Sequence, residues 1–254
     1  MNVRTLLPLA CLVAAVTTSG QRGAVAAQAA GRGTIKGHIK LSGELPGNRV
    51  IRMGMDPMCA AINKGKQVVQ ETVAASLDGS LANVFVRLQG AFPQTPVPTQ
   101  PVTIDQRGCL YVPRVIGARV GQILQVKNSD ELLHNVHSLS AKANTFNVSE
   151  PKAGIVQPFT LKDEEAMLRI KCDVHNWMTT YVGVVTNPYF AVSNTMGTFE
   201  IANVPPGTYT IQAWQERYGP VMQKVTVKAG ATSTVDFRYT GEGESSRSKV
   251  QSSK

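Results

Sequence analysis

Apolar and polar residues alternate over short stretches of this chain, and no long stretch repeats its apolar residues at helical spacing. Residues 166–172 place Leu168, Ile170 and Cys172 on one face and Met167, Arg169 and Lys171 on the other, which predicts a half-buried strand. The same alternation predicts further strands at 34–41, 81–88, 124–128, 181–185, 224–227 and 234–237, with two more inside 196–211. Glycine and proline turn signals separate these stretches. The pattern therefore predicts an all-β chain.

Side chains with metal-binding atoms are concentrated in two short segments. Cys172, His175 and Met178 lie within seven residues directly after a predicted strand, and His134 lies upstream in the run LLHNVHS. Two imidazoles, one thiolate and a weak axial thioether form the ligand set of a blue copper electron-transfer site. Soft sulfur suits Cu(I), and imidazole binds both oxidation states. A second candidate, His137, differs from His134 by an odd number of residues, so an extended chain sends them to opposite faces.

The two segments resemble those of the cupredoxins, and amicyanin most closely. HNVH at 134–137 is similar to the first-ligand segment of that family, and CDVHNWM at 172–178 is similar to its C-x-x-H-x-x-M loop. The resemblance covers about residues 100–187 and implies a Greek-key cupredoxin β-sandwich. It also implies one mononuclear type 1 copper, held by the four ligands His134, Cys172, His175 and Met178.

The same resemblance assigns roles to neighbouring residues. It implies that His137 does not bind copper and that Asn135 joins the two ligand loops by hydrogen bonds. Asn176 stands where amicyanins carry proline, a difference that concerns loop stiffness and the redox potential while leaving the ligands intact.

Each donor also has an interpretation without copper. A single loop histidine often only forms hydrogen bonds, a buried cysteine often acts as a small apolar residue, and Met178 beside Trp177 could belong to the core. Zinc is the competing metal, because one cysteine with two or three histidines binds it tetrahedrally; the thioether of Met178 argues against zinc. A binuclear copper centre needs two cysteines in the ligand loop, and this loop has one.

A second module is expected near the C-terminus. Residues 196–211 contain two alternating strands joined by a Pro-Pro-Gly turn, and they resemble the carboxypeptidase regulatory-like, transthyretin-like β-sandwich. The run GTIKGHIKLSGELPG at 33–47 is similar to the opening strand of that module. The copper domain could therefore precede the module or be inserted in it. Relatives that pair these modules tend to carry histidines where Asn187 and Gln215 stand here, which argues against a second metal site.

The N-terminal residues have the layout of a secretory signal. Arg4 precedes an apolar run that is too short to span a bilayer, and small-residue cleavage sites follow it. A lipoprotein would use Cys11, which comes too early. We therefore expect a periplasmic or otherwise exported protein with no transmembrane segment after signal removal. The expected organisation is a signal peptide at 1–26, a cupredoxin-like copper domain with an N-terminal β extension at 33–190, a carboxypeptidase regulatory-like module at 191–240, completed by 33–55 if the copper domain is inserted, and a disordered tail at 241–254.

Three cysteines remain after removal of such a signal. Export to an oxidising compartment predicts a disulfide between Cys59 and Cys109, with Cys172 as the unpaired thiol. Two buried thiols remain the alternative, because spacing alone does not determine pairing. An unpaired thiol in such a compartment is best protected by a metal.

The formal net charge of +9 over 254 residues indicates attraction to acidic partners or surfaces. Nucleic acid is not an expected partner, because the chain is predicted to be exported, has few aromatic residues and has no recognisable nucleic-acid-binding module. We expect a one-electron carrier between redox proteins such as cytochromes or a dehydrogenase with an acidic docking surface. The family position of His175 implies that electrons leave through it, from within a rim of apolar and basic residues.

Two other functions are alternatives to the carrier. One is a cell-envelope interaction or carbohydrate-binding β protein whose copper site is structural or stores copper. The other is an enzyme, which is not expected, because a copper oxidase needs an open coordination position or further copper sites. His137 and His38, the latter expected at the surface without a partner, are too few and too badly placed to build one.

Overall fold

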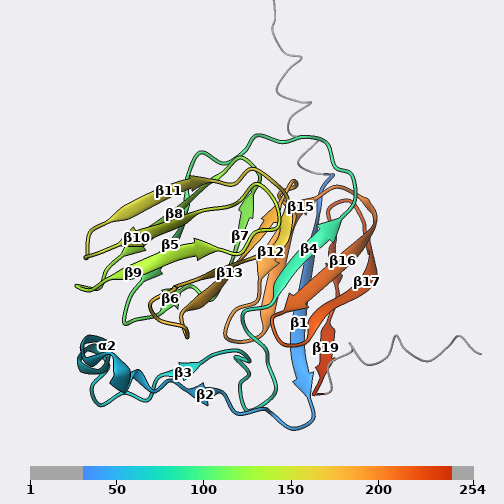
Figure 1. Ribbon diagram of the computed structural model, residues 1–254. Helices are drawn as coiled ribbons and strands as arrows, with labels where there is room; N and C mark the ends of the chain where they lie inside the picture. Colours follow the sequence, from blue (N-terminus) through green and yellow to red (C-terminus); the bar gives the residue numbers. More distant parts are fainter. Residues whose placement is uncertain (1–30, 242–254) are drawn as a thin grey trace, which may run out of the picture.

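The computed structural model describes residues 31–241. The predicted signal peptide with Cys11, and residues 242–254 of the predicted tail, lie outside the described residues. The described chain forms two β-sandwiches that lie side by side (Figure 1). Within it, no helix has the length and apolar character needed to cross a membrane.

The first sandwich contains the segments with the candidate metal donors. One sheet has the strand order β10 (Asn147–Glu150), β9 (His134–Ser138), β12 (Glu165–Lys171), β13 (Thr179–Val185) and β7 (Val115–Arg119). The facing sheet has the order β11 (Val156–Thr160), β8 (Ile123–Asn128), β5 (Val102–Gln106) and β6 (Tyr111–Val112). Alternate residues of both sheets, such as Val126 and Leu168, meet in one buried cluster, as the period-two pattern predicts.

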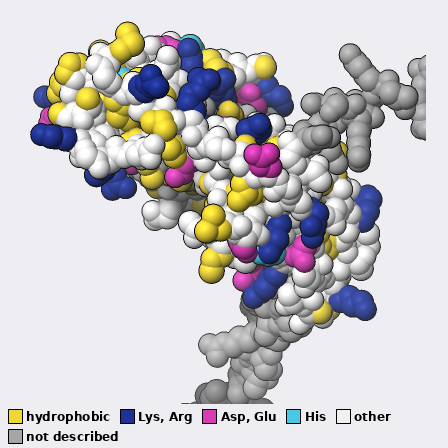
Figure 2. All heavy atoms as spheres, turned by 90° about the horizontal axis from the view of Figure 1, so that it is seen from below, with side chains coloured by type: hydrophobic (Ala, Val, Ile, Leu, Met, Phe, Trp, Pro, Cys, Tyr) yellow, Lys and Arg dark blue, Asp and Glu magenta, His cyan; other side chains and the backbone are white. Residues whose placement is uncertain are grey.

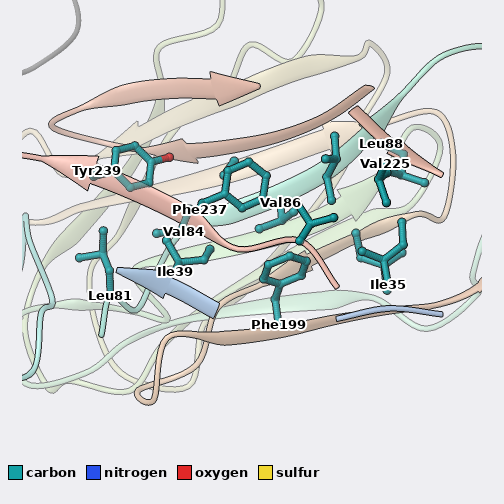
Figure 3. Close-up of a cluster of buried hydrophobic side chains, with 14 of the residues drawn as sticks. Ile35, Ile39, Leu81, Val84, Val86, Leu88, Phe199, Val225, Phe237 and Tyr239 are labelled. Atoms are coloured by element: carbon teal, nitrogen blue, oxygen red, sulfur yellow. The ribbon is translucent and has the colours of Figure 1, made fainter. Parts of the chain in front are cut away.

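The second sandwich combines strands from both ends of the described chain. One sheet contains β15 (Thr198–Val204), β1 (Gly33–Ser42), β18 (Thr232–Thr234) and β19 (Phe237–Thr240). The other has the order β14 (Phe190–Val192), β4 (Phe85–Gln89), β16 (Gly207–Gln215) and β17 (Gly219–Val227). Figure 3 shows its core, in which Ile35, Phe199 and Phe237 of the first sheet pack with residues of the second.

The first sandwich is inserted in the second. β4 and β14 pair as antiparallel neighbours, yet every strand from β5 to β13 lies between them in sequence. The predicted domain range 33–190 therefore differs from this arrangement, because β1 and β4 belong to the sheets of the C-terminal module. The proline-rich run 93–101 connects β4 to β5 and so links the two sandwiches.

The predicted strand at 234–237 is interrupted in the structure. β18 ends at Thr234 and β19 begins at Phe237, although both run parallel to β1. Between them, a side-chain oxygen of Asp236 accepts the bond from the backbone N–H of His38 at 2.8 Å. A Cβ on Gly37 would lie 1.9 Å from the carbonyl oxygen of Val235, so glycine permits this close crossing.

Three polar residues have structural partners in or beside the second sandwich. His38 was expected to be a surface residue without a partner, but it is half-buried and its Nε2 lies 2.8 Å from the Oγ of Ser80. The side chain of Asn187 bonds the backbone of Leu88 and Tyr189. Gln215 bonds the carbonyl of Thr72 and two backbone N–H groups. These bonds account for Asn187 and Gln215 without a metal.

A buried phenylalanine packs at the contact between the two sandwiches. The ring of Phe85 packs against Gly117 and Gly183, where an added Cβ would lie 2.9 Å and 2.3 Å from that ring. Beside it, Arg114 forms a bidentate pair with Glu216 at 2.7 Å, and both side chains are nearly buried. Aromatic burial and a desolvated ion pair together fix the two sandwiches against each other.

Residues 49–70, here called the cap, leave the second sandwich and lie against the end of the first (Figure 1). The cap consists of β2 (Arg49–Val50), η1 (Met53–Met55), α2 (Pro57–Ile62) and β3 (Val69–Gln70). β2 pairs with β3, and Met53 is buried in the core of the first sandwich. Asp56 caps the N-terminus of α2 by accepting bonds from the N–H groups of Met58 and Cys59. The alternating pattern along the chain did not predict this helix.

Candidate metal centre

Three of the four predicted ligands converge at the end of the first sandwich that the cap covers. His134 begins β9, while Cys172 and His175 lie in the loop between β12 and β13. One donor atom of each lies within 4.8 Å of the other two. The two Nδ1 atoms are 3.1 Å apart, and the Sγ of Cys172 is 3.8 Å from the Nδ1 of His175. All three side chains are buried.

Hydrogen bonds hold the ligand loop in a closed turn. The N–H of Cys172 donates to the carbonyl of Met178 at 3.2 Å, and the N–H of Met178 donates to the carbonyl of His175 at 2.9 Å. The N–H of His175 points to the Sγ of Cys172 at 3.4 Å. Met178 is completely buried in the same cluster as Cys172. The fourth predicted ligand therefore lies at the end of this turn, inside the core.

Both histidines are oriented by carboxylates on their outer nitrogens. The Nε2 of His134 lies 3.0 Å from Asp130, and the Nε2 of His175 lies 2.9 Å from Asp56. A carboxylate at Nε2 keeps the proton on that nitrogen and leaves the Nδ1 lone pair for a metal. The two Nδ1 atoms therefore point toward each other and toward the thiol of Cys172, so the three donor atoms converge on one place.

The hydrogen bonds also change the acidity of the donors. Burial raises the pKa of the Cys172 thiol, but bonds from His134, His175 and backbone N–H groups lower it to about 6. Burial lowers the pKa of His134, whereas its bonds to Asp130 and Cys172 raise it to about 9. The lowered pKa of Cys172 favours the thiolate at neutral pH, which is the form of cysteine that binds metals. The raised pKa of His134 favours its protonated ring, so a metal that binds there must displace a proton from the imidazole.

Asn135 joins the two ligand segments, as the family resemblance implies. Its side-chain oxygen accepts a bond from the N–H of Asp173, the residue after Cys172, at 3.1 Å. Its side-chain N–H groups donate to Asn147 and to the carbonyl of Val148. The first ligand segment, the ligand loop and β10 are thus tied together by one side chain.

His137 lies away from the cluster. It follows His134 by three residues on β9, and its Nδ1 lies 2.9 Å from the carboxylate of Asp173. Its side chain is 30% exposed, whereas that of His134 is completely buried. The strand period therefore separates the two histidines as predicted.

The cap covers the outer edge of His175. Asp56 on the cap bonds its Nε2, and the Sγ of Cys59 lies 3.5 Å from the same nitrogen. His175 is only 2% exposed. The family position of His175 implies an imidazole edge at the surface, where a partner could touch it. The structure differs, because Asp56 and Cys59 occupy that edge.

A disulfide fastens the cap to the first sandwich. Cys59 is bonded to Cys109, and Cys172 is the free cysteine among the described residues, which confirms the predicted pairing. Two further groups, Asp56 with Cys59 and His175, and Cys109 with Asp130 and His134, have metal-like spacing. Disulfide sulfurs are not thiolates, so neither group competes with the cluster of His134, Cys172 and His175.

The donor set fits a soft metal that binds imidazole. Two Nδ1 atoms and a thiolate converge in an apolar pocket with a buried thioether nearby, which is the combination that suits copper in both oxidation states. Cys172, His134 and His175 would supply the strong bonds to copper, and the Met178 thioether would supply a weaker one.

Sequence reasoning missed Asp56 and Asp130. Asp130 was visible in NSDELLH, four residues before His134, and it also accepts bonds from the N–H groups of Gly108 and Cys109. Asp56 precedes Pro57, a pairing typical of a helix start, and that signal would have located α2. Nothing in the local pattern links either residue to the ligand loop.

The disulfide leads to a simple chemical prediction. Protein lacking residues 1–26, freed of copper and unfolded without reductant, should show one titratable thiol, because Cys59 and Cys109 are bonded. The Cys172→Ser variant should show none, which assigns the single thiol. Three titratable thiols in the first protein would contradict the pairing.

Comparisons with known proteins agree with the two-sandwich architecture. The model of the carboxypeptidase regulatory-like domain matches residues 182–240, which include β14 to β19 of the second sandwich. No curated protein sequence matches the chain.

Similar solved structures are cupredoxins and a copper enzyme. A purple cupredoxin from Nitrosopumilus maritimus is 20% identical, with coverage of 33% of this chain and 98% of that one and a TM-score of 0.29. A methionine-to-alanine variant of amicyanin with Cu(I) is 17% identical, with coverage of 39% and 97% and a TM-score of 0.30. The Cu-containing nitrite reductase of Thermus scotoductus SA-01 is 19% identical, with coverage of 37% and 24% and a TM-score of 0.30. At these low identities and scores, the metal assignment rests on the donor atoms of this chain.

Proposed function

We propose that this protein is an exported one-electron carrier with a mononuclear type 1 copper site formed by His134, Cys172, His175 and Met178. The observation that carries the proposal is the arrangement of the two imidazoles. Both Nε2 atoms are held by carboxylates while both Nδ1 atoms converge beside the thiol of Cys172. Copper bound there would supply a reversible one-electron change.

The chain keeps the donors in nearly one geometry. Asp130 and Asp56 fix the two rings, Asn135 fixes the start of the loop, and three hydrogen bonds close it. Donors that do not move need little reorganisation when the charge of the site changes. This rigidity supports a carrier over a storage site, which must release its metal.

Burial of the donors supports a carrier over an enzyme. His134 and Met178 are completely buried and His175 almost so, which leaves no open position for a substrate to reach. Electrons, unlike substrates, can cross a few ångströms of protein. The proposed partners are redox proteins with acidic docking surfaces, because the chain without residues 1–26 has a net charge of +7, from 24 basic and 17 acidic residues, which favours encounter with negative proteins.

The Met178 thioether would distinguish a redox site from a structural one. In Met178→Gln a harder oxygen donor should stabilise Cu(II) more than Cu(I) and lower the reduction potential by about 60 mV or more, a tenfold change for one electron. Voltammetry of the copper-loaded protein measures this shift. Met167→Gln, in the contact between the sandwiches, is the matched control and should leave the potential unchanged. If the copper of the native protein is not oxidised and reduced reversibly, the proposed carrier function is wrong.

A further inference from the structure

The cap changes where a redox partner can approach the centre. We propose that the cap and Trp177 together form the docking surface for an acidic redox protein, and that electrons leave the centre through the ring of Trp177. The proposal deepens the carrier function proposed above and rests on it. It is carried by the cover on His175, the position of Trp177, and the charge of the groove beside it.

The cover on His175 is firmly attached. The Cys59–Cys109 disulfide bonds the cap to the first sandwich, and the side-chain amide of Asn63 donates to the carbonyl of Gly108 at 3.1 Å. Met53 adds apolar burial in the core. Asp56 and Cys59 then occupy the outer edge of the imidazole, so a partner protein cannot touch His175 in this arrangement.

Trp177 provides the nearest aromatic step from the centre to solvent. Its ring centroid lies 5.1 Å from that of His175, and its Nε1–H donates to the carbonyl of Cys109 at 2.9 Å. That bond fixes the orientation of the indole. Trp177 is half-buried, because one side packs on the core of the first sandwich while the other lines a surface groove.

The groove beside Trp177 is lined by apolar, amide and basic side chains. It has a volume of about 700 Å³, and residues of β2, the start of the cap, line it together with Trp177. Val50 is 43% exposed and Met55 is 97% exposed. Arg49 and Arg52 supply two positive charges, and no carboxylate lines the groove. In the view from below, basic and apolar side chains mingle on the side of the molecule where the cap lies (Figure 2).

This composition favours a protein with a negative docking face. Tryptophan, methionine and arginine are enriched at protein interfaces, and exposed apolar area with flanking charge is typical of them. Within residues 31–241 neither Arg49 nor Arg52 forms a salt bridge, so both guanidinium groups are available to a carboxylate of the partner. Charge complementarity of this kind raises the association rate at low salt.

The docking surface is tested by reversing its charge. The double variant Arg49→Glu, Arg52→Glu is compared with Lys224→Glu, Lys228→Glu, which makes the same change of charge on the second sandwich. Stopped-flow mixing of the copper-loaded, reduced protein with an oxidised acidic c-type cytochrome gives the second-order rate. At low ionic strength the arginine variant should be slower by about tenfold or more and the lysine variant by less than about twofold. High salt should reduce the difference.

The relay is tested separately by Trp177→Leu. This variant should slow electron transfer at every ionic strength while the salt dependence stays as in the native protein, because the docking charges are unchanged. A visible band and potential like those of the native protein would show that its centre is intact. A native rate in this variant would overturn the relay through Trp177.

A binding experiment tests the groove without electron transfer. Hexacyanochromate(III) is a paramagnetic anion that broadens NMR signals near its binding site. It should broaden the indole N–H of Trp177 and the backbone N–H of Gln70 in the native protein, and neither in the arginine variant. Equal rates and equal broadening in the arginine and lysine variants would overturn the docking surface while leaving the carrier function standing. A native protein without a thiolate–copper band would instead refute the carrier function itself.

Discussion

Copper-loaded Cys172→Ser should lose the intense blue or green absorption band completely. That band arises from charge transfer between a thiolate and Cu(II), and Cys172 is the free cysteine of the described chain and one of the three converging donors. Serine is similar in size to cysteine, and the substitution replaces only the sulfur with an oxygen. We therefore expect the fold to persist, as circular dichroism can verify, while the visible spectrum of the oxidised protein becomes nearly colourless.

The disulfide cysteines provide the matched control. The double variant Cys59→Ser, Cys109→Ser removes sulfur 3.5 Å from His175 but leaves the thiolate. It should keep the band and lose about 2–5 kcal/mol of stability against denaturant, because a cross-link across 50 positions restricts the unfolded chain. A band that survives in Cys172→Ser would refute the proposed site, as would a native protein that takes up only zinc when copper is plentiful.

His134→Gly should abolish the coloured site, and added imidazole should restore it. The completely buried ring of His134 leaves a cavity of its own shape beside His175 and Asp130, and free imidazole can enter it and offer a nitrogen to copper. The recovery of the band can be measured by titrating imidazole into the variant at a fixed copper concentration. Such a recovery would show that the variant has lost a ligand and not its fold. The variant should also be less stable without imidazole, because buried Asp130 loses a hydrogen-bond partner.

His137→Ala is the control for that experiment, since it removes a histidine from the same strand. His137 contacts Asp173 through a partly exposed hydrogen bond, which contributes about 1 kcal/mol. The band should therefore stay near its native position. Loss of colour in His137→Ala with retention in His134→Gly would reverse the assignment of the two histidines.

The ligand loop could be predicted because its determinants are local. Alternation up to Ile170 places Cys172 on the buried face, and the three-residue steps to His175 and Met178 fit one turn. The odd spacing of His134 and His137 likewise places them on opposite faces of the strand, and the family resemblance indicates which of the two faces the core. In these segments the sequence period and the tertiary contacts require the same residues to be buried.

The position of the cap over His175 could not be predicted, because the contacts that hold it there join residues that are distant in sequence. Asp56 and His175 are 119 positions apart, and Cys59 and His175 are 116 apart. The helix between Pro57 and Ile62 has only six residues, too few to establish a helical period. A bond between such distant segments depends on the tertiary fold of the whole chain. The alternation of apolar residues along one segment does not predict it.

His38 shows the same limit at smaller scale. Its neighbours along β1 suggested exposure, but Ser80 approaches its ring from 42 positions away. The sequence does not determine whether one sandwich is inserted in the other, for a similar reason. A short match at residues 33–47 indicated the module, and only the pairing of β4 with β14 located the insertion point.

The pairing of β1 has a consequence for the order in which the molecule folds. β1 pairs with β15, β18 and β19, and its bond from His38 to Asp236 spans 198 positions. The strands of the inserted sandwich, in contrast, are continuous in sequence from β5 to β13. As the chain emerges in sequence, the inserted sandwich can close while β1 still lacks its partner strands β15, β18 and β19, since contacts between distant residues form slowly. The second sandwich is therefore completed last, beside a first sandwich that is already folded.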